Sequence, residues 1–211
     1  MARGYLDAVK ILLVDDNPFT CRLVRQVLTV FGARDFTISH DAQEAYNLVG
    51  DKMPDLAIVN WQMKPVTGLD LVKRLRKDEK SPNPFLPIIM MTAFADPKHV
   101  FTARDAGVNE YVIKPVSAKA LYGRIQAVIE KPRRFVRVGE FFGPDRRRHG
   151  DIFPGADRRG AEGEEKKVAA QGPVADMKQD EVDRLFNPDE VANGNGAQNG
   201  KAANGAKPAE K

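Results

Sequence analysis

Cysteine is almost absent from the sequence, because Cys21 is the only one among 211 residues. A single thiol cannot form an internal disulfide, which excludes a secreted disulfide scaffold and a metal site built on cysteines. Long apolar runs are absent as well, since none approaches the roughly 18 residues of a membrane-spanning helix. The first ten residues, MARGYLDAVK, contain no apolar segment of a secretory signal. We therefore expect a cytoplasmic protein with no membrane partner.

Aliphatic residues become scarce after residue 130, and this change divides the chain. The segment that follows is basic, with nine lysine or arginine residues against four acidic residues in 131–160. A short basic stretch of this kind suits contact with an anion. The predicted parts are a folded domain at 8–130, a basic arginine-rich extension at 131–160, a flexible linker at 161–175, a short amphipathic peptide at 176–190 and a disordered low-complexity tail at 191–211.

Within the predicted domain, an apolar run followed by a helical pattern recurs five times. The runs are KILLV, DFTIS, DLAIVN, PIIMMTA and EYVI, and the helices that follow begin at the capping residues Asn17, Asp41, Thr67, Asp96 and Ser117. Most runs are continuously apolar, which indicates strands buried on both faces of a parallel sheet. We predict an α/β fold, a flavodoxin-like doubly wound (βα)5 parallel sheet of strand order 2-1-3-4-5, with a long, mostly disordered C-terminal tail.

This topology would bring together polar residues that are far apart in the sequence. In a doubly wound sheet, the functional site lies beyond the carboxyl ends of the strands, where the strand order reverses. The residues expected there are Asp15 and Asp16 after the first strand, Asn60 at the end of the third, Thr92 after the fourth and Lys114 after the fifth.

The motifs at these positions resemble the receiver domain of bacterial response regulators. They are ILLVDD, PDLAIVNWQM with Gly68 downstream, PIIMMTA and AGVNEYVIKP, and the resemblance covers roughly residues 8–130. It implies that Asp15 and Asp16 would hold Mg²⁺, a hard cation that prefers oxygen ligands. It also implies that a carboxylate at the end of the third strand accepts a phosphoryl group.

The same resemblance implies roles for three further residues. Thr92 and Lys114 would bind the phosphoryl oxygens, with a hydroxyl and an ammonium group. Tyr111 would turn inward and remodel the face formed by the fourth helix, the fifth strand and the fifth helix. The alternative is that Tyr111 is a fixed, half-buried aromatic residue at the end of a strand.

Asn60 departs from the receiver pattern, because it occupies the position of the phosphoryl acceptor, eight residues before Gly68. An amide is a poor nucleophile and cannot form the acyl phosphate. It also removes one negative charge, so Mg²⁺ should bind weakly, and Lys114 can pair with either aspartate. Trp61 and Lys64 are further departures in the same loop, which favours natural divergence over an introduced substitution.

We therefore expect a pseudo-receiver without enzymatic activity that works through protein–protein contacts in a two-component, phosphorelay or chemotaxis-type pathway. Expected partners are a histidine kinase, a chemotaxis protein or a flagellar switch component. The alternative is a genuine phosphoryl-accepting receiver with an atypical site. No second set of helices suited to DNA binding follows residue 130.

Paired arginines in the basic extension suggest a third possibility. Phe142-Gly143-Pro144-Asp145-Arg146-Arg147 is echoed by a second copy that ends at Asp157-Arg158-Arg159. Arginine pairs next to a turn suit bidentate contact with phosphate, and a nearby phenylalanine can stack on a base. The hypothesis is an effector of a nucleotide such as cyclic di-GMP, or of RNA. The alternative is a solvated basic linker.

The predicted C-terminal peptide contains QDEVDRLF, residues 179–186. Val182, Leu185 and Phe186 form one apolar stripe, and Glu181 directly precedes it in the sequence. The peptide is similar to the short N-terminal peptide of flagellar switch proteins that chemotaxis receivers bind. A helix this short is marginal in water, so it would fold into a groove. The peptide could then dock on its own chain or recruit another receiver.

Overall fold

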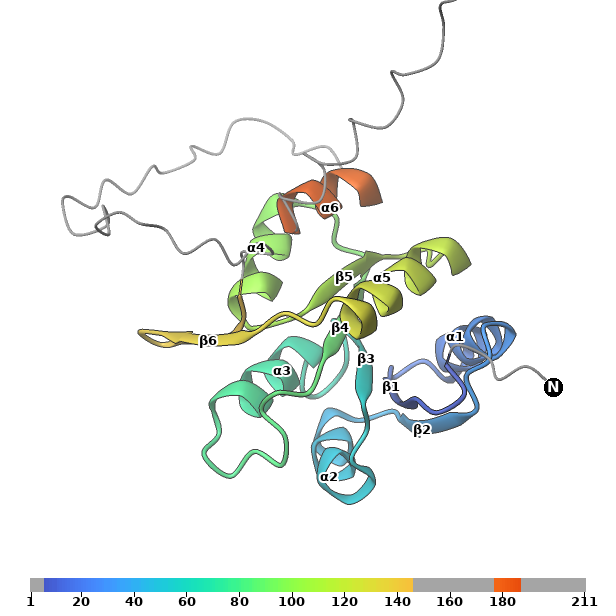
Figure 1. Cartoon of the computed structure of the whole chain (residues 1–211), viewed down its shortest axis with the longest axis horizontal. Coiled ribbons are helices and arrows are strands. Elements are labelled where there is room, and N and C mark those ends of the chain that lie inside the picture. Colours follow the sequence, from blue (N-terminus) through green and yellow to red (C-terminus); the bar gives the residue numbers. More distant parts are fainter. Residues whose placement is uncertain (1–5, 146–176, 187–211) are drawn as a thin grey trace, which may run out of the picture.

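The computed structural model describes residues 6–145 and 177–186, and Figure 1 shows them as a sheet wrapped by helices. The five strands of the main sheet are β1 Lys10–Val14, β2 Asp35–Ser39, β3 Leu56–Asn60, β4 Ile88–Thr92 and β5 Glu110–Ile113. They are all parallel and lie in the order β2-β1-β3-β4-β5. The fold class predicted from the sequence is confirmed.

Five helices connect and follow these strands. They are α1 Pro18–Val30, α2 Ala42–Lys52, α3 Gly68–Lys77, α4 Pro97–Asp105 and α5 Ala118–Glu130. Each begins where the sequence indicated, since the side chains of Asn17, Asp41, Thr67, Asp96 and Ser117 accept hydrogen bonds from main-chain N–H groups of the first turn. These caps satisfy donors that would have no partner inside the helix.

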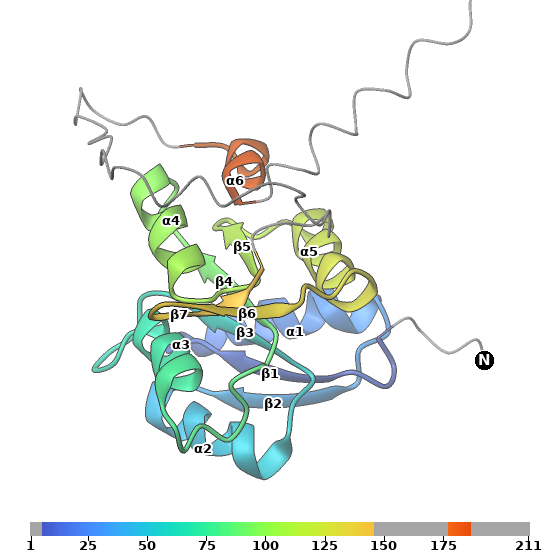
Figure 2. The same cartoon turned by 60° about the vertical axis from the view of Figure 1, so that its left-hand side comes forward.

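The two faces of the sheet carry two separate hydrophobic cores. Side chains of α1 and α5, such as Leu28 and Ile125, pack on one face. Side chains of α2, α3 and α4, such as Val49, Leu75 and Val100, pack on the other. Figure 2 shows the same division of the helices around the sheet. Burial on both faces explains why β3 and β4 are apolar without alternation.

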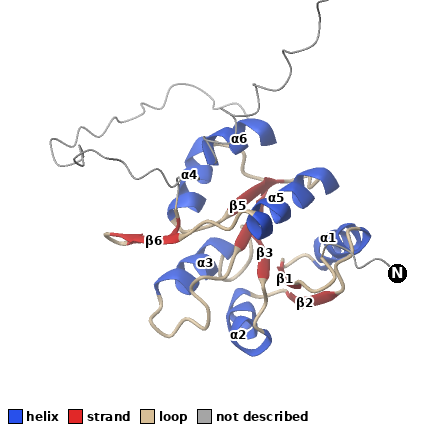
Figure 3. Cartoon of the chain, in the orientation of Figure 1, coloured by secondary structure: helices blue, strands red, loops and turns tan. Residues whose placement is uncertain are grey.

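An antiparallel hairpin that we did not predict follows α5. It consists of β6 Phe135–Val138 and β7 Phe141–Pro144, and Figure 3 marks β6 as a strand at the edge of the molecule. The hairpin packs on the domain so closely that a Cβ on Gly143 would lie 2.7 Å from the Cα of Gly107. Folded structure therefore extends at least to Asp145.

Beneath the hairpin lies Arg76, which is 3% exposed. Its guanidinium group stacks on the ring of Phe135 at 4.9 Å and donates to the carbonyl oxygens of Gly107, Pro84 and Leu86. Burial lowers the pKa of Arg76 to about 9. This arginine joins the end of α3 to the loop before β5 and to the hairpin.

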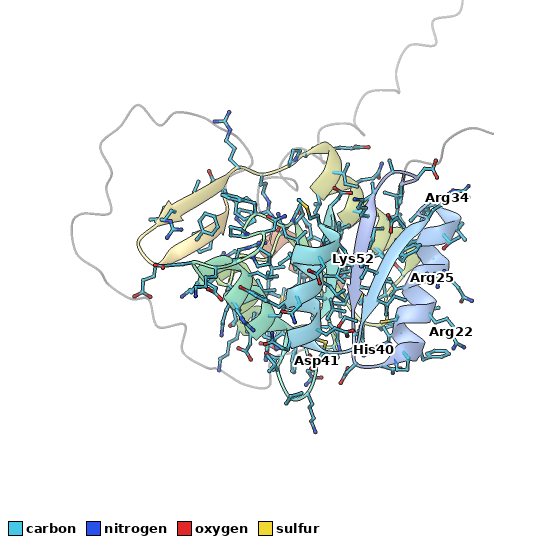
Figure 4. All side chains as sticks on the ribbon, turned by 90° about the horizontal axis from the view of Figure 1, so that it is seen from below. Arg22, Arg25, Arg34, His40, Asp41 and Lys52 are labelled. Atoms are coloured by element: carbon cyan, nitrogen blue, oxygen red, sulfur yellow. The ribbon has the colours of Figure 1, made fainter. Side chains whose placement is uncertain are left out.

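The last described element is α6 Gln179–Phe186, which lies beside α4 and β5 in both Figure 1 and Figure 2. It falls within the predicted amphipathic peptide at 176–190. On the other face of the sheet, Figure 4 shows Arg22 and Arg25 pointing outward from α1. No helix among residues 6–145 and 177–186 has the length and apolarity needed to cross a membrane.

Candidate functional site

The candidate site lies at the carboxyl ends of β1, β3 and β5. Asp15 and Asp16 follow β1, Asn60 is the last residue of β3, and Lys114 follows β5. Because neighbouring parallel strands end at the same edge of the sheet, these four side chains meet there. Asp15 is 1% exposed and Asn60 is 6% exposed, whereas Asp16 is open to solvent.

Lys114 connects the first and third strands. Its Nζ lies 2.9 Å from Oδ2 of Asp15 and donates to Oδ1 of Asn60 at 3.0 Å. The amide nitrogen of Asn60 donates to Oδ1 of Asp16 at 3.3 Å and to the carbonyl oxygen of Gln62 at 2.5 Å. Asn60 is thus an acceptor on one side and a donor on the other, and a carboxylate cannot fill both roles.

The main chain and side chain of Asp15 have partners that the sequence did not indicate. Its carbonyl oxygen accepts from the Sγ of Cys21 at 3.6 Å and lies 2.8 Å from Nδ1 of His40, which Figure 4 labels beyond the end of β2. Its Oδ1 accepts from the main-chain N–H of Asn17 at 2.9 Å. Asp15 is therefore fixed from several sides, and both of its carboxylate oxygens have partners.

Cys21 lies in this same layer and is 3% exposed. Burial raises the pKa of its thiol to about 11, and the charge of Asp15 adds to that effect. We expect a thiol reagent at pH 8 to modify Cys21 at least about 100-fold more slowly in the folded protein than in urea, since each unit of pKa changes the thiolate fraction tenfold. The measurement is the modification rate in the two conditions.

The same shift predicts a dependence of stability on pH. Between pH 9 and 11 the unfolded thiol has lost its proton while the folded thiol keeps it, so the free energy of unfolding falls as the pH rises. Tyr46 and Tyr111, whose pKa values are raised, contribute in the same direction, whereas Arg76, whose pKa is lowered, contributes in the opposite one. The comparison is therefore with Cys21→Ala: between pH 9 and 11, the free energy of unfolding of the natural sequence should fall relative to that of this variant. Equal slopes for the two proteins would contradict the prediction.

Thr92 and Tyr111 form a second group next to the site. The hydroxyl of Tyr111 donates to the carbonyl oxygen of Phe94 at 2.9 Å. Burial raises the pKa of Tyr111, and a hydrogen bond with Thr92 acts in the opposite direction. Thr92 also accepts from the N–H of Phe94 at 3.0 Å. Thr92 is therefore engaged with Tyr111 and its own loop, and the tyrosine side chain is 1% exposed.

Trp61 occupies the space between the two groups. Its ring makes edge contacts with Phe94 at 5.7 Å, His99 at 5.3 Å and Tyr111 at 6.4 Å between ring centroids. It is only 7% exposed. The residue after Asn60 thus reaches from the site to Tyr111 and α4. The sequence indicated only that Trp61 is bulky, because its neighbours come from distant segments.

His99 completes this aromatic cluster. Its ring stacks on Phe94 at 4.0 Å and its Nδ1 is paired with the carboxylate of Asp96, the N-cap of α4. Burial acts to raise the pKa of Asp96, but hydrogen bonds from the side chain and main chain of His99 outweigh it, so the pKa lies below its ordinary value. The start of α4 is therefore fixed by Asp96 and His99 against Trp61.

The donors at the site do not make a complete magnesium site. Asp15 and Asp16 would be the ligands, but both oxygens of Asp15 are engaged by Lys114 and Asn17. The oxygen of Asn60 also accepts from Lys114, and its nitrogen faces Asp16. Among the residues that the structure describes, no cluster of three acidic, histidine or cysteine side chains could hold a metal ion.

Some candidate residues fall outside what the structure describes. The proposed anion-binding residues Arg146, Arg147, Arg158 and Arg159 lie there, as do the predicted linker at 161–175 and the tail at 191–211. Glu181 and Val182 lie on α6, where Glu181 accepts from the N–H of Lys178 at 2.8 Å. Leu185 and Phe186 belong to the same helix, although their side chains are outside the described part.

Known proteins with similar sequences and structures point to one family. The family model described as "Response regulator receiver domain" matches residues 11–126. The chain is 32% identical to the chemotaxis protein CheY of Pseudomonas aeruginosa over 123 residues, which are 58% of this chain and 98% of that protein. It is 33% identical to the chemotaxis protein CheY1 of Helicobacter pylori over 122 residues, which are 57% and 97% of the two chains.

The structural likeness agrees with the sequence match. The Vibrio cholerae chemotaxis protein CheY4 superimposes with a TM-score of 0.52 and 27% identity, over 57% of this chain and 98% of that one. Together with the five-stranded parallel sheet and the acidic pair beside Lys114, these matches support a signalling role. The chain belongs to the response regulator receiver domain family.

Proposed function

We propose that this protein is a pseudo-receiver: a signalling protein that keeps the receiver fold, accepts no phosphoryl group at the end of β3 and acts by binding other proteins. The observation that carries the proposal is the position of Asn60. Its amide stands where the family's acceptor carboxylate would stand and contacts both Lys114 and Asp16.

The chemistry of the amide supports this function. Its nitrogen lone pair is delocalised into the carbonyl and its oxygen bears no full negative charge, so it is a poor nucleophile toward a phosphoryl donor. Both acceptors of its N–H₂ group, the Asp16 carboxylate and the Gln62 carbonyl, would repel a carboxylate oxygen at the same place. The surroundings of Asn60 are thus arranged for an amide.

Magnesium has a minor part in this proposal. Mg²⁺ would supply charge neutralisation for a phosphoryl group in an intact receiver, and Asp15 and Asp16 would be its ligands. Here the ammonium of Lys114 already neutralises Asp15 at 2.9 Å. We therefore propose that any Mg²⁺ binding is weak and that the ion pair serves to hold β1 and β5 together.

Tyr111 supports a fixed signalling state. Its side chain is buried and turned inward, against Trp61 and under a hydrogen bond to the Phe94 carbonyl. The resemblance associates an inward aromatic residue with remodelling of the face formed by α4, β5 and α5. We propose that Trp61 maintains this orientation without a phosphoryl signal, and that partners in a chemotaxis-type pathway bind the resulting surface.

Incubation with a small phosphodonor and Mg²⁺, followed by mass measurement of the intact protein, tests the proposal. We expect no gain of mass for the natural sequence, because Asn60 leaves the acceptor position at the end of β3 without a carboxylate to attack the phosphorus. Asn60→Asp should gain the mass of one phosphoryl group and lose it again at alkaline pH, as an acyl phosphate does.

Two outcomes would change this assignment. A stable phosphoryl group on the natural sequence would favour the alternative, a phosphoryl-accepting receiver with an atypical site. If Asn60→Asp also gains nothing, then Trp61 or the neighbouring Lys64 blocks the pocket, and the double variant Asn60→Asp with Trp61→Ala separates the two contributions.

A further inference from the structure

Helix α6 covers the surface formed by α4, β5 and α5. It packs beside α4 and β5, as Figures 1 and 2 show from two directions. The side chain of Val182 is fully buried there and belongs to the hydrophobic core cluster that contains Val100, Ala103 and Tyr111. Met177, just before the helix, packs against the same cluster. The C-terminal segment is therefore part of the core on this side of the sheet.

Gln179 pairs with the free edge of β5. Its Oε1 accepts from the main-chain N–H of Ile113 at 2.7 Å, and its Nε2 donates to the main-chain carbonyl of Tyr111 at 2.9 Å. A primary amide has one acceptor and two donors, so it satisfies the edge in the way that another strand would. The main chain adds one more bond, from the N–H of Met177 to the carbonyl of Ala95 at 3.1 Å.

Charged groups continue the contact at the other side of β5. Asp183 of α6 is paired with Arg124 of α5. The same arginine donates to Glu110 at 3.2 Å, and Arg133 lies 3.5 Å from the other oxygen of Glu110. Glu110 is 2% exposed, so this network of alternating acidic and basic side chains is largely screened from water. The surface therefore offers the cation of Arg124 where α6 presents the carboxylate of Asp183, and this pairing favours one register of the helix.

We propose that the surface formed by α4, β5 and α5 binds other proteins, and that α6 of the same chain occupies this surface and blocks their access to it. The partner that fits is a protein segment that forms a short helix with the pattern of α6: a glutamine in the first turn, an aliphatic residue three positions later and an aspartate directly after it. Such a segment can bind only when α6 leaves.

The energetics make α6 a displaceable ligand. An eight-residue helix is marginal on its own in water, so its order depends on docking. A ligand on its own chain competes at an effective concentration that can reach about a millimolar. A partner of ordinary affinity is therefore held back by the attached helix, and it gains access when its own concentration or affinity is high enough.

The inference deepens the proposed function, because it names the surface and the class of partner. It does not depend on Asn60, so its test and the phosphodonor test can fail separately. Displacement of α6 can also be followed by tryptophan fluorescence. Trp61 is the only tryptophan, and it contacts Tyr111, whose main chain binds Gln179. Displacement of α6 should therefore change its emission.

A labelled peptide of residues 176–190 tests the proposal by fluorescence anisotropy against the full-length protein and its variants. Val182→Asp places a charge in the core contact and should release α6 from its own chain. We expect the labelled peptide to bind this variant at least about tenfold more tightly than it binds the natural sequence, because the internal competitor is gone. Gln179→Ala should give an intermediate gain.

The neighbouring residue provides a matched control. Asp180 is exposed on α6, and Asp180→Ala should leave the affinity for the peptide unchanged. Equal affinity for the natural sequence and for both Val182→Asp and Gln179→Ala would overturn the proposal, as would failure of the peptide to bind any of them. Light scattering tests whether α6 docks on its own chain or on a second copy. If the natural sequence were a dimer and Val182→Asp a monomer, α6 would dock between two copies, and masking within one chain would be overturned.

Discussion

Gly68→Ala should destabilise the protein by about 3 kcal/mol, because inserted atoms have no room at this position. A Cβ on Gly68 would lie 1.9 Å from the main-chain oxygen of Asn60 and 2.7 Å from Cγ1 of Val59. The first of these is backbone of the strand that carries the site, so neither a rotamer change nor a small shift of a side chain relieves the clash. Thermal unfolding should show a midpoint lower by about 10 °C.

Gly123→Ala is the matched control for this change. Gly123 lies in the middle of α5, and a Cβ there would meet nothing within 4 Å. Alanine is the better helix former, so this variant should gain up to about 1 kcal/mol. If Gly68→Ala were as stable as the natural sequence, the close packing of α3 on the end of β3 would be incorrect.

Arg76→Met should cost about 3 kcal/mol, because it removes donors from buried carbonyl oxygens. Arg76 donates to Gly107 at 3.0 Å and to Leu86 at 2.7 Å, and methionine can replace neither bond. Among the described residues no carboxylate pairs with Arg76, so the variant leaves no unpaired acid behind. Denaturant unfolding measures the loss, and hydrogen exchange of the β6 and β7 amides should become faster, since Phe135 loses the cation beneath it.

Lys77→Met tests whether the effect is specific to the buried arginine. Lys77 is the next residue of α3 and is exposed, so the same substitution there should change stability by no more than about 0.5 kcal/mol. A loss for Arg76→Met as small as that for Lys77→Met would mean that the guanidinium group does not hold the hairpin.

The five βα units could be predicted because their signals are local. Continuous apolar runs indicated β3 and β4, and a capping residue marked the start of each helix. The strand order then places Asp15, Asn60 and Lys114 at one edge of the sheet, which is why three distant segments could be assigned to one site. Pairing of Lys114 with one of the two aspartates was also expected, and Lys114 pairs with Asp15, but the sequence did not indicate which aspartate it would choose. The two-sided hydrogen bonding of Asn60 depends on positions set by the folded main chain.

The hairpin was missed because its signals are not local. The FVRV run of β6 is partly exposed and basic, and it reads as a continuation of the arginine-rich segment. The hairpin is held by Arg76, which lies under Phe135, and by Gly107, which Gly143 of β7 approaches closely. Arg76 and Gly107 are both far from the hairpin in the sequence. Similarly, the apolar stripe of α6 indicated that this helix would bind in a groove of a protein, but not which groove. Its position depends on the free edge of β5.

The hairpin also bears on where this domain can be cut. The family match ends at residue 126 and the helical pattern fades at Lys131, so a fragment that stops at residue 130 looks complete by sequence. That fragment would leave Phe85 without its ring partners Phe135 and Phe142, and it would open the guanidinium of Arg76 to water. A piece that ends after Asp145 keeps these contacts and the pairing of β6 with β7. If shorter pieces were compared for partner binding, the loss of a binding site could not be told apart from the loss of these stabilising contacts.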